Sequence, residues 1–511
     1  MIKTKINRHD IEYFLYAMVK AFYKDAVVEA PDTADHNKLE DDVREDQDLV
    51  TCNLTSQGMT VSFNKGKCFL EDKEYSYEFS EKEDDSEYKD IVRGYIYDAL
   101  ADYSGNVLPW GNLTGIRPTK LYMNLFRALD SGFDTENEYT KDQIAQVVNA
   151  MALRHRVSDY KGQLAADIAI REKKIIDSFD NKDGYSLYIG IPFCPSTCLY
   201  CSFTSYPIVS YKDKVRSYLD AIYEELKAAK EIMAGKHLDT IYIGGGTPSS
   251  LSAEDMDYLL SKVQEVFGNE NIAEYTVEAG RADSITEDKL KVLKKYGVSR
   301  ISVNPQTMND DTLKRIGRHH DTKAVIDAFN MAREVGFDNI NMDIILGLPG
   351  EDLTYVERTL EAIKELKPDS LTVHSLAIKR ASRLKEMMDK YNSEIGVIDF
   401  DKAMNMSIEA ADSMGLKPYY LYRQKDMGGN LENTGFALDG KYGIYNILMM
   451  EEVQSIYAIG AGTVTKRVFE DGHIERCDTH KDVNLYIADI EAMIERKRGL
   501  FAKKERNRSY E

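Results

Sequence analysis

The sequence predicts an α/β fold: an incomplete barrel of six strand–helix units, with an α+β N-terminal domain and a C-terminal α+β extension. Six short β-rich runs alternate with amphipathic helical patterns between residues 185 and 377. Such alternation is typical of a parallel sheet. An open doubly wound sheet is the alternative to a barrel. A full barrel needs eight units, so six suggest an incomplete barrel with a lateral opening. The expected domains are 1–180, 181–400 and 401–511.

Residues 1–180 are expected to form an accessory domain. A helical pattern spans residues 8–24, and alternation broken by turn residues predicts a β meander over 49–80. Two more helical patterns follow, near 88–104 and 138–178. Between them lies "LPWGNLTGIRPTKLYMN", which holds the only tryptophan, Trp110.

The barrel segment has a regular order of elements. The expected strands are 185–191, 239–245, 274–280, 300–306, 339–347 and 370–377. The expected helices are 211–235, 253–267, 286–297, 322–336 and 353–366. "SAED" at 252–255 fits a capping box that begins the second helix. Residues 401–511 mix helices, such as 482–497, with short strands, and are expected to cover the opening.

Charge and hydropathy exclude several classes of function. The formal net charge is −20 and the pI is near 5.1, which argues against nonspecific binding to nucleic acid or to anionic lipid. No apolar run approaches the ~20 residues that span a bilayer, and the N-terminus lacks the features of a signal peptide. We therefore expect a cytoplasmic protein without membrane insertion, whose thiols stay reduced.

Three cysteines stand in the loop after the first barrel strand, in "IPFCPSTCLYC". They are Cys194, Cys198 and Cys201. Functional loops of parallel α/β folds follow the carboxyl ends of strands. Structural zinc takes four ligands and an ordinary four-iron cluster takes four thiolates, so a cluster on three thiolates keeps one iron open. Zinc with a distant fourth ligand, or a disulfide with one free thiol, stay open as alternatives.

The motif C-x₃-C-x₂-C after a strand resembles the signature of the radical S-adenosylmethionine (SAM) enzymes. Further motifs, in order, resemble the oxygen-independent coproporphyrinogen III oxidase family: "GGGTP", "VEAGR", "VNPQT", "IGRHH", "DIILGLPG" and "YAIGAGTV". The resemblance covers about residues 185–465. The long N-terminal region, "LTGIRPTKL" and residues 420–436 look like the HemZ-type branch, the coproporphyrinogen dehydrogenases.

The resemblance implies a barrel of radical SAM type with two cofactors, a [4Fe–4S] cluster and SAM. The cluster would be held by Cys194, Cys198 and Cys201, which are the implied catalytic and metal-binding residues. The implied SAM-binding residues are Tyr188, Tyr200, Gly245, Gly246, Thr247, Glu278, Gln306, Arg318, Asp343 and Ala377. The implied partners are a small-molecule tetrapyrrole substrate and an electron donor such as a flavodoxin or ferredoxin, with no nucleic acid.

The reaction that the resemblance implies is the oxidative decarboxylation of coproporphyrinogen III to protoporphyrinogen IX in haem biosynthesis. Candidate cations for the substrate's propionates are Arg117, Lys120, Lys379, Arg380 and Arg423. Residues 419–424 are candidates to line a macrocycle, and His319 and His320 to meet a haem iron.

The sequence departs from the family pattern at two places. Gln306 is preceded by "NP", where the family has "GV". The family's "Y-x-H-I-P-F-C" histidine, which lies beside the cluster in the oxidases, is Gly190 here. Two alternatives therefore stay open: a haem chaperone related to the oxidases, and a radical SAM methyltransferase that acts on a tetrapyrrole.

Overall fold

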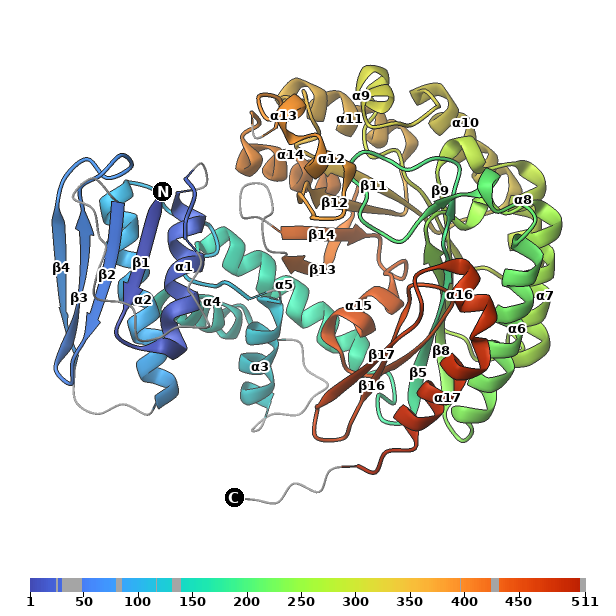
Figure 1. The fold of residues 1–511 in the computed structure, drawn as a ribbon, viewed down its shortest axis with the longest axis horizontal. Helices are drawn as coiled ribbons and strands as arrows, with labels where there is room; N and C mark the ends of the chain where they lie inside the picture. Colours follow the sequence, from blue (N-terminus) through green and yellow to red (C-terminus); the bar gives the residue numbers. More distant parts are fainter. Residues whose placement is uncertain are drawn as a thin grey trace. The chain divides into compact units, whose positions relative to one another are not determined.

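The structure is a computed structural model and forms two compact units, residues 1–167 and 168–511 (Figure 1). The boundaries expected near residues 180 and 400 stay predictions. Among the residues that the structure describes, no helix is long and apolar enough to cross a membrane. The described residues are 1–23, 26–29, 48–79, 85–115, 117–130, 139–395, 397–423 and 432–505.

The first unit contains a four-stranded sheet in the order β1-β2-β3-β4. The antiparallel pairing of β2 with β3 and of β3 with β4 confirms the predicted meander, and β1 joins it parallel to β2. Side chains of α1 and α2 pack with the inner face of the strands in one apolar core. The bounds are β1 Ile2–Ile6, α1 His9–Phe22, β2 Asp48–Leu54, β3 Gly58–Asn64, β4 Lys73–Glu78 and α2 Asp85–Ser104.

One helix prediction in the N-terminal region is wrong in extent, and one helix was missed. The pattern over 138–178 forms two helices, α4 (Lys141–His155) and α5 (Asp159–Ile176), because Arg156 adopts a left-handed conformation with φ of 56° and ends the first. The structure also contains α3 (Thr119–Asp130), which the sequence pattern did not predict. This helix follows Pro118 and buries Tyr122, Met123 and Phe126.

Six parallel strands form the centre of the second unit, in the order β5-β8-β9-β10-β11-β12. They confirm the predicted α/β class and the incomplete six-unit barrel. The strand predicted at 300–306 is shorter than expected, because β10 ends at Val303 and Gln306 has a positive φ of 66°. The bounds are β5 Gly184–Ile191, β8 His237–Gly245, β9 Glu274–Gly280, β10 Arg300–Val303, β11 Ile340–Leu346 and β12 Ser370–Ser375.

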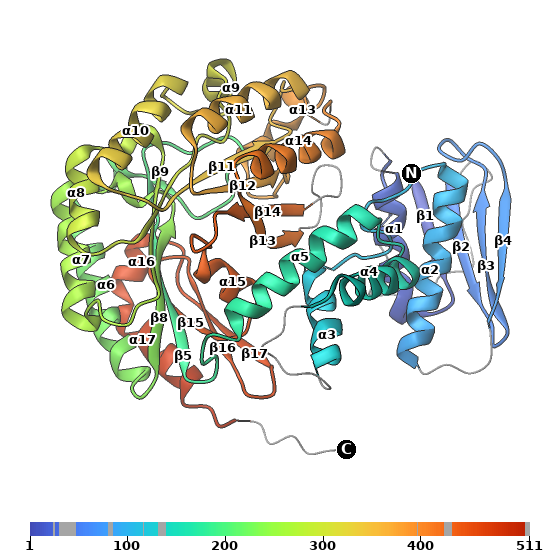
Figure 2. The same ribbon diagram turned by 180° about the vertical axis from the view of Figure 1, so that it is seen from behind.

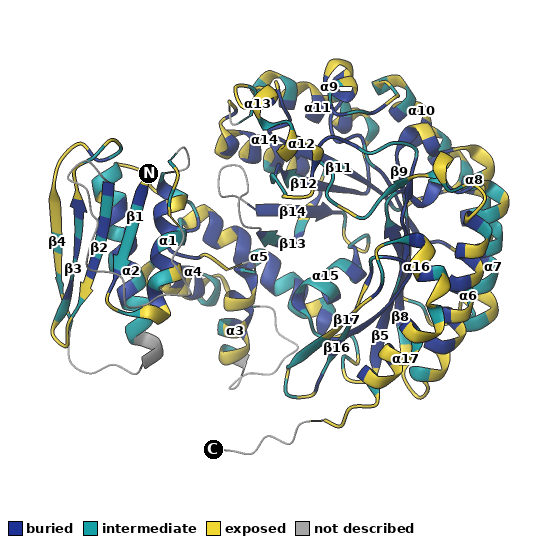
Figure 3. Ribbon diagram, viewed as in Figure 1, coloured by how far each residue is buried: buried dark blue, intermediate teal, exposed yellow. Residues whose placement is uncertain are grey.

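Helices cover the outer face of these strands, and their solvent sides are exposed (Figures 1 and 3). The bounds of α7 and α11 are as predicted, and the Ser252 side chain accepts from Asp255 N–H at 3.1 Å at the start of α7. The Asp255 carboxylate accepts from the Ser252 hydroxyl. The helices are α6 Val215–Ile232, α7 Ala253–Phe267, α8 Glu287–Lys295, α9 Asp310–Arg315, α10 Thr322–Val335, α11 Leu353–Leu366 and α14 Phe400–Ser413.

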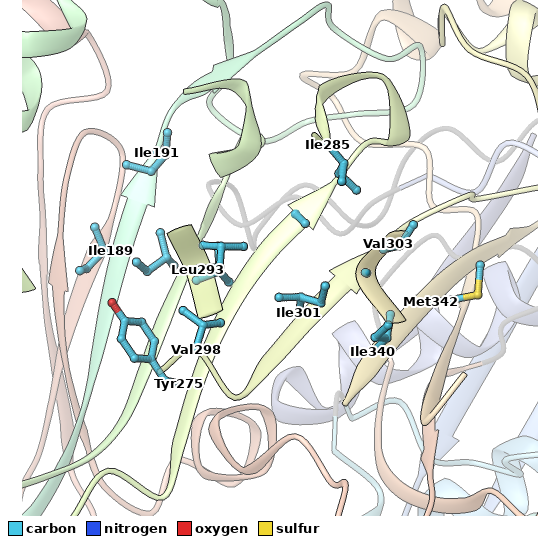
Figure 4. Close-up of a cluster of buried hydrophobic side chains, with 14 of the residues drawn as sticks. Ile189, Ile191, Tyr275, Ile285, Leu293, Val298, Ile301, Val303, Ile340 and Met342 are labelled. Carbon is cyan, nitrogen blue, oxygen red and sulfur yellow. The ribbon is translucent and has the colours of Figure 1, made fainter. Parts of the chain in front are cut away.

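Strand residues that point toward the helices are almost fully buried. Figure 4 shows Ile189, Ile191 and Ile301 among them, and each is 0% exposed. Parallel strands covered on both faces are expected to be apolar in this way. The short elements of this unit are β6 Phe193–Cys194, β7 Tyr206–Pro207, η1 Ile208–Ser210, η2 Pro248–Ser250, η3 Ala282–Ser284, α12 Arg383–Glu386 and α13 Met388–Tyr391.

The C-terminal segment extends the sheet at both edges, which the sequence did not predict. β14 (Glu432–Ala437) pairs antiparallel with β12, and β13 (Lys417–Arg423) pairs with β14. At the other edge β15 (Ser455–Ile459) pairs parallel with β5. β16 (Val464–Val468) and β17 (Ile474–Asp478) follow it.

Helix α15 (Ile444–Glu451) lies on the side of the sheet opposite α6, α7 and α8 (Figures 1 and 2). Its first N–H groups, from Ile444 and Tyr445, donate to the Glu274 carboxylate at 2.6 and 3.3 Å. A carboxylate at a helix N-terminus satisfies unpaired amides and the helix dipole. This contact places Tyr445 against the inner face of the sheet.

A buried ion pair joins α17 to α6. The predicted helix 482–497 is two helices, α16 (Val483–Ala488) and α17 (Ile490–Phe501). Lys497 on α17 donates to Glu225 on α6, and the two side chains are 1% and 0% exposed. Glu225 also accepts from Gly460 N–H at 3.1 Å and from the Tyr486 hydroxyl. Removal of one partner leaves a buried charge without compensation.

We predict that Lys497→Met destabilises the second unit by about 3–5 kcal/mol, because Glu225 stays buried without its cation. The measurement is hydrogen exchange by mass spectrometry on peptides of α6 and α17. The control is Lys291→Met, which removes an exposed pair whose side chains are 60% and 59% exposed. Equal protection in both variants would contradict the prediction.

Candidate functional site

The cysteine loop, residues 192–205, follows β5 and is held by hydrogen bonds to the end of α9 and to α12. Leu199 N–H donates to Ile316 O at 2.9 Å, and Leu384 N–H donates to Leu199 O at 2.8 Å. Cys194 and Cys198 are 7% and 8% exposed, and Cys201 is partly buried. All three cysteines are free. The loop therefore offers three thiols from a backbone that the rest of the barrel fixes.

The glycine motif after β8 packs directly on this loop. Gly246 N–H donates to Ile191 O and Thr247 N–H to Phe193 O, both at 2.8 Å. A Cβ at Gly246 would lie 2.9 Å from Cys194 Sγ and 2.6 Å from Phe193 O, so only glycine fits. Gly245 has a φ of 111°. The structure thus explains Gly246 by its close approach to the Cys194 thiol and Gly245 by its positive φ. The contact of both glycines with SAM stays a prediction.

The thiols of Cys194 and Cys201 are protonated at neutral pH until a metal binds. Burial raises the pKa of the Cys194 thiol to about 11, and burial also raises the pKa of Cys201. Metal binding must therefore displace protons from these groups. Among the described residues, no group of three His, Cys, Asp or Glu side chains is placed to hold a single metal ion. Thiolates that bind different irons of one cluster are spaced more widely than ligands of one ion.

Two buried arginines lie beside Cys198. Arg281 Nη1 donates to Cys198 Sγ at 3.8 Å. Arg318 Nη2 donates to Tyr200 Oη at 3.2 Å. Burial by itself would lower the pKa of Arg318, but Tyr200 and Cys198 raise it above its usual value. The sequence analysis predicted Arg318 as a site residue and missed Arg281. The sequence signal that could have found Arg281 is its position directly after the third barrel strand.

Arg318 provides a test of fit for a carboxylate ligand. Its side chain is buried, and its Nε has no hydrogen-bond partner among the described residues. An unpaired buried donor in a native structure requires an explanation. The carboxylate of SAM is an acceptor of the right kind, and Tyr200 and Arg318 lie together beside Cys198. The residues present therefore fit a cluster with SAM.

The inner face of the sheet carries a second group of predicted residues. Tyr242 Oη donates to Glu278 Oε1 at 2.5 Å. The Tyr188 ring is stacked with Tyr242 at 6.0 Å between centroids, and Tyr242 is stacked with Tyr445 at 4.5 Å. Tyr242 and Tyr445 were missed, because strand alternation alone does not show that they meet Tyr188.

Glu278 and Asp343 titrate differently inside this group. Burial raises the pKa of Glu278 to about 7, and the nearby Asp343 charge adds to the rise. Burial would also raise the pKa of Asp343, but His374 and Asn341 lower it below the usual value. Asn341 Nδ2 donates to Asp343 Oδ1 at 2.7 Å. At neutral pH Asp343 is therefore ionised, whereas Glu278 is close to half protonated.

Gln306 and Ala377 complete the predicted set of SAM-binding residues. Gln306 is 8% exposed, and its N–H donates to Asp343 O at 2.9 Å. Its positive φ of 66° is unusual for a residue other than glycine and holds it beside β11. Ala377 lies two residues after β12 and is partly buried. The contacts of both residues with SAM stay predictions.

The candidate substrate residues are more scattered. Arg117 and Lys120 belong to the first unit, so nothing places them relative to the cysteines. Lys379 and Arg380 follow β12. Arg423 is 4% exposed, and burial lowers its pKa to about 10. The part of 420–436 from 424 to 431 lies outside the described residues.

The two histidines differ in exposure. His319 is exposed, whereas the side chain of His320 is 2% exposed. His320 Nδ1 lies 3.5 Å from Asp283 Oδ1. A haem iron would need an accessible ring nitrogen, and His320 instead faces Asp283, the ion-pair partner of Arg281.

Comparisons with known proteins give the family of the chain. The Radical SAM superfamily matches residues 188–363. The oxygen-independent coproporphyrinogen-III oxidase-like protein HemZ of Bacillus subtilis strain 168 is 40% identical over 441 residues, which cover 84% of this chain and 85% of that protein. The chain belongs to this family of radical SAM proteins. Membership implies a four-iron cluster and SAM, and it gives the barrel the radical SAM fold.

Other members of the family match shorter stretches. Heme chaperone HemW of Bacillus subtilis is 39% identical over 206 residues, or 40% of this chain and 54% of HemW. Oxygen-independent coproporphyrinogen III oxidase of Escherichia coli K12 is 32% identical over 192 residues, which cover 38% of this chain and 42% of that protein. The solved structure of Escherichia coli coproporphyrinogen III oxidase (HemN) covers 63% of this chain and 72% of its own, with 21% identity and a TM-score of 0.48.

We predict that Cys198→Ala abolishes assembly of the cluster, because two thiolates remain of three. Anaerobic reconstitution followed by iron analysis and absorption spectroscopy measures this. Cys477→Ala is the control, since that buried thiol lies on β17. Full iron content in Cys198→Ala would show that Cys198 is not a ligand.

We also predict that SAM binds roughly tenfold more tightly at pH 8 than at pH 6, because Glu278, with its pKa raised to about 7, becomes ionised over this range. A carboxylate accepts from ammonium or hydroxyl groups, and a carboxylic acid does so poorly. Isothermal titration calorimetry measures the affinity. Glu278→Gln keeps any pH dependence that comes from SAM itself and is expected to lose the part that comes from Glu278. A pH profile in that variant equal to the parent's would contradict the role of Glu278 in SAM binding.

Proposed function

We propose that the protein converts coproporphyrinogen III to protoporphyrinogen IX by oxygen-independent oxidative decarboxylation of two propionates. The observation that carries the proposal is the likeness to HemZ over most of the chain, in a protein whose three thiols, Tyr200 and Arg318 lie together. When bound, the cluster and SAM would supply a 5′-deoxyadenosyl radical to take a hydrogen from the propionate carbon β to the carboxylate. Loss of CO₂, and of one electron to a one-electron acceptor, would complete each vinyl group.

The residues of this chain bind and orient the ligands, and they exclude water from the site. Tyr200 and Arg318 offer donors to a carboxylate beside Cys198. Glu278 and Asp343 offer acceptors on the inner face of the sheet. Tyr188, Tyr242 and Tyr445 form an aromatic wall beside them, and such a wall limits side reactions of a radical with solvent.

A run of cations after β12 supports an anionic substrate. Lys379, Arg380, Arg383 and Lys385 lie within seven residues, in a chain with a net charge of −20. None of the four forms an ion pair with another described residue. The segment touches the cysteine loop, since Leu384 packs with Leu199. Propionates of a tetrapyrrole have the charge that these groups would bind.

A second candidate function is a haem chaperone, and Gly190 is the observation that favours it. A Cβ at Gly190 would lie 2.6 Å from Cγ2 of Thr463, in the loop between β15 and β16. Thr463 therefore fills the space into which the family's histidine side chain would extend. The barrel therefore has no imidazole at this position, whereas the family's oxidases carry one beside the cluster. HemW, whose name describes a heme chaperone, matches 40% of the chain.

Anaerobic turnover tests the proposal. Reduced protein is incubated with SAM and coproporphyrinogen III, and 5′-deoxyadenosine, vinyl products and S-adenosylhomocysteine are assayed together. The proposal predicts two decarboxylations, each with one 5′-deoxyadenosine. Deoxyadenosine without vinyl product would reject the substrate, stoichiometric haem binding without turnover would favour the chaperone, and S-adenosylhomocysteine would indicate a methyltransferase.

We further predict that Gly190→Ala lowers cluster content, because its Cβ would overlap the Thr463 methyl at the end of β5. Thr463→Ser removes that methyl and keeps the hydroxyl that donates to Gly460 O at 2.8 Å. The double variant Gly190→Ala/Thr463→Ser is therefore expected to recover the iron content of the parent. If Thr463→Ser does not rescue Gly190→Ala, the loss of cluster is not caused by overlap between the new Cβ and the Thr463 methyl.

A further inference from the structure

Arg281 is the buried cation nearest to the cysteine loop for which neither the motifs nor the proposed reaction gives a role. It is 3% exposed and follows Gly280, the last residue of β9, whose φ of 67° turns the chain toward the loop. Arg281 Nη1 donates to Ser196 O and Ser196 Oγ at 2.9 Å each, and to Cys198 Sγ at 3.8 Å. One guanidinium nitrogen thus contacts both the loop backbone and a predicted cluster ligand.

The other side of the guanidinium is fixed by a carboxylate. Arg281 Nε and Nη2 donate to the two oxygens of Asp283 at 2.9 and 2.6 Å, a bidentate geometry. His320 lies against the same carboxylate, with Nδ1 at 3.5 Å from Oδ1. Arg281 cannot move from Cys198 without losing these bonds, so its positive charge has a fixed position.

We propose that Arg281 is a positioning residue that raises the reduction potential of the cluster. One-electron reduction adds a negative charge, and a fixed positive charge with a hydrogen bond to a ligand sulfur stabilises the reduced form. The electron comes from a low-potential one-electron donor. The proposal rests on the cluster that family membership implies, and not on the identity of the substrate.

A merely structural role would have a different signature. If Arg281 only held Ser196, its loss would disturb cluster assembly and would leave the potential of any assembled cluster unchanged. Substitution separates the positive charge of Arg281 from its hydrogen bonding. Arg281→Lys keeps the charge, and Arg281→Gln removes the charge while keeping a hydrogen-bond donor. Asp283→Asn keeps Arg281 and loosens its position.

The test is a redox titration of the reconstituted protein with dithionite and mediators, followed by electron paramagnetic resonance. Arg281→Gln is expected to shift the midpoint to a more negative potential by about 59 mV, which corresponds to a tenfold less favourable one-electron reduction. Arg281→Lys is expected to stay near the parent value, and Asp283→Asn to fall between them. Iron content and the spectrum of each variant show whether the cluster is intact.

Arg300→Gln is the matched control. Arg300 is also 3% exposed, but it lies at the first residue of β10 and donates to Asn339 Oδ1 and Lys441 O. It is expected to leave the potential unchanged. The proposal is overturned if Arg281→Gln carries an intact cluster at the parent potential, or if Arg300→Gln shifts it equally. Absence of any cluster in the parent protein would instead reject the cofactor assignment.

Discussion

Three thiolates must face one point while a fourth coordination position stays open, and the short cysteine loop cannot meet this requirement alone. Its backbone bonds go mostly to other parts of the barrel. Leu199 is held between Ile316 and Leu384, Ser196 Oγ donates to Gly317 O, and Gly246 leaves room for Cys194 Sγ. The geometry of the cysteine loop therefore depends on contacts from several parts of the barrel. For this reason a site of three cysteines needs a large α/β fold.

The C-terminal segment supports the same loop from the first strand. Tyr218 Oη donates to Gly190 O at 2.7 Å and accepts from Ala461 N–H at 2.9 Å. Gly460 has a φ of 105°, and a Cβ there would lie 2.5 Å from Gly190 O. The glycine-rich turn after β15 is thus required for close packing on β5. Cofactor binding at the cysteines and the stability of the C-terminal part are expected to be coupled.

Much of the barrel could be predicted from the sequence because its signals are local. Apolar runs marked the six strands, and the spacing of three cysteines after β5 pointed to an open iron. Contacts between distant residues gave no such signal. The approach of Arg281 to Cys198, the stacking of Tyr445 on Tyr242 and the filling of the Gly190 space by Thr463 depend on the fold. The helix break at Arg156 was missed because a left-handed arginine carries no clear pattern.

The most direct measurement is electron paramagnetic resonance of the reduced, reconstituted protein before and after addition of SAM, with iron and zinc counted on the same sample. If one iron of the cluster has an open coordination position, we expect four irons per chain and a spectrum that changes when SAM binds to that iron. Stoichiometric zinc, or a four-iron spectrum that SAM leaves unchanged, would contradict the account.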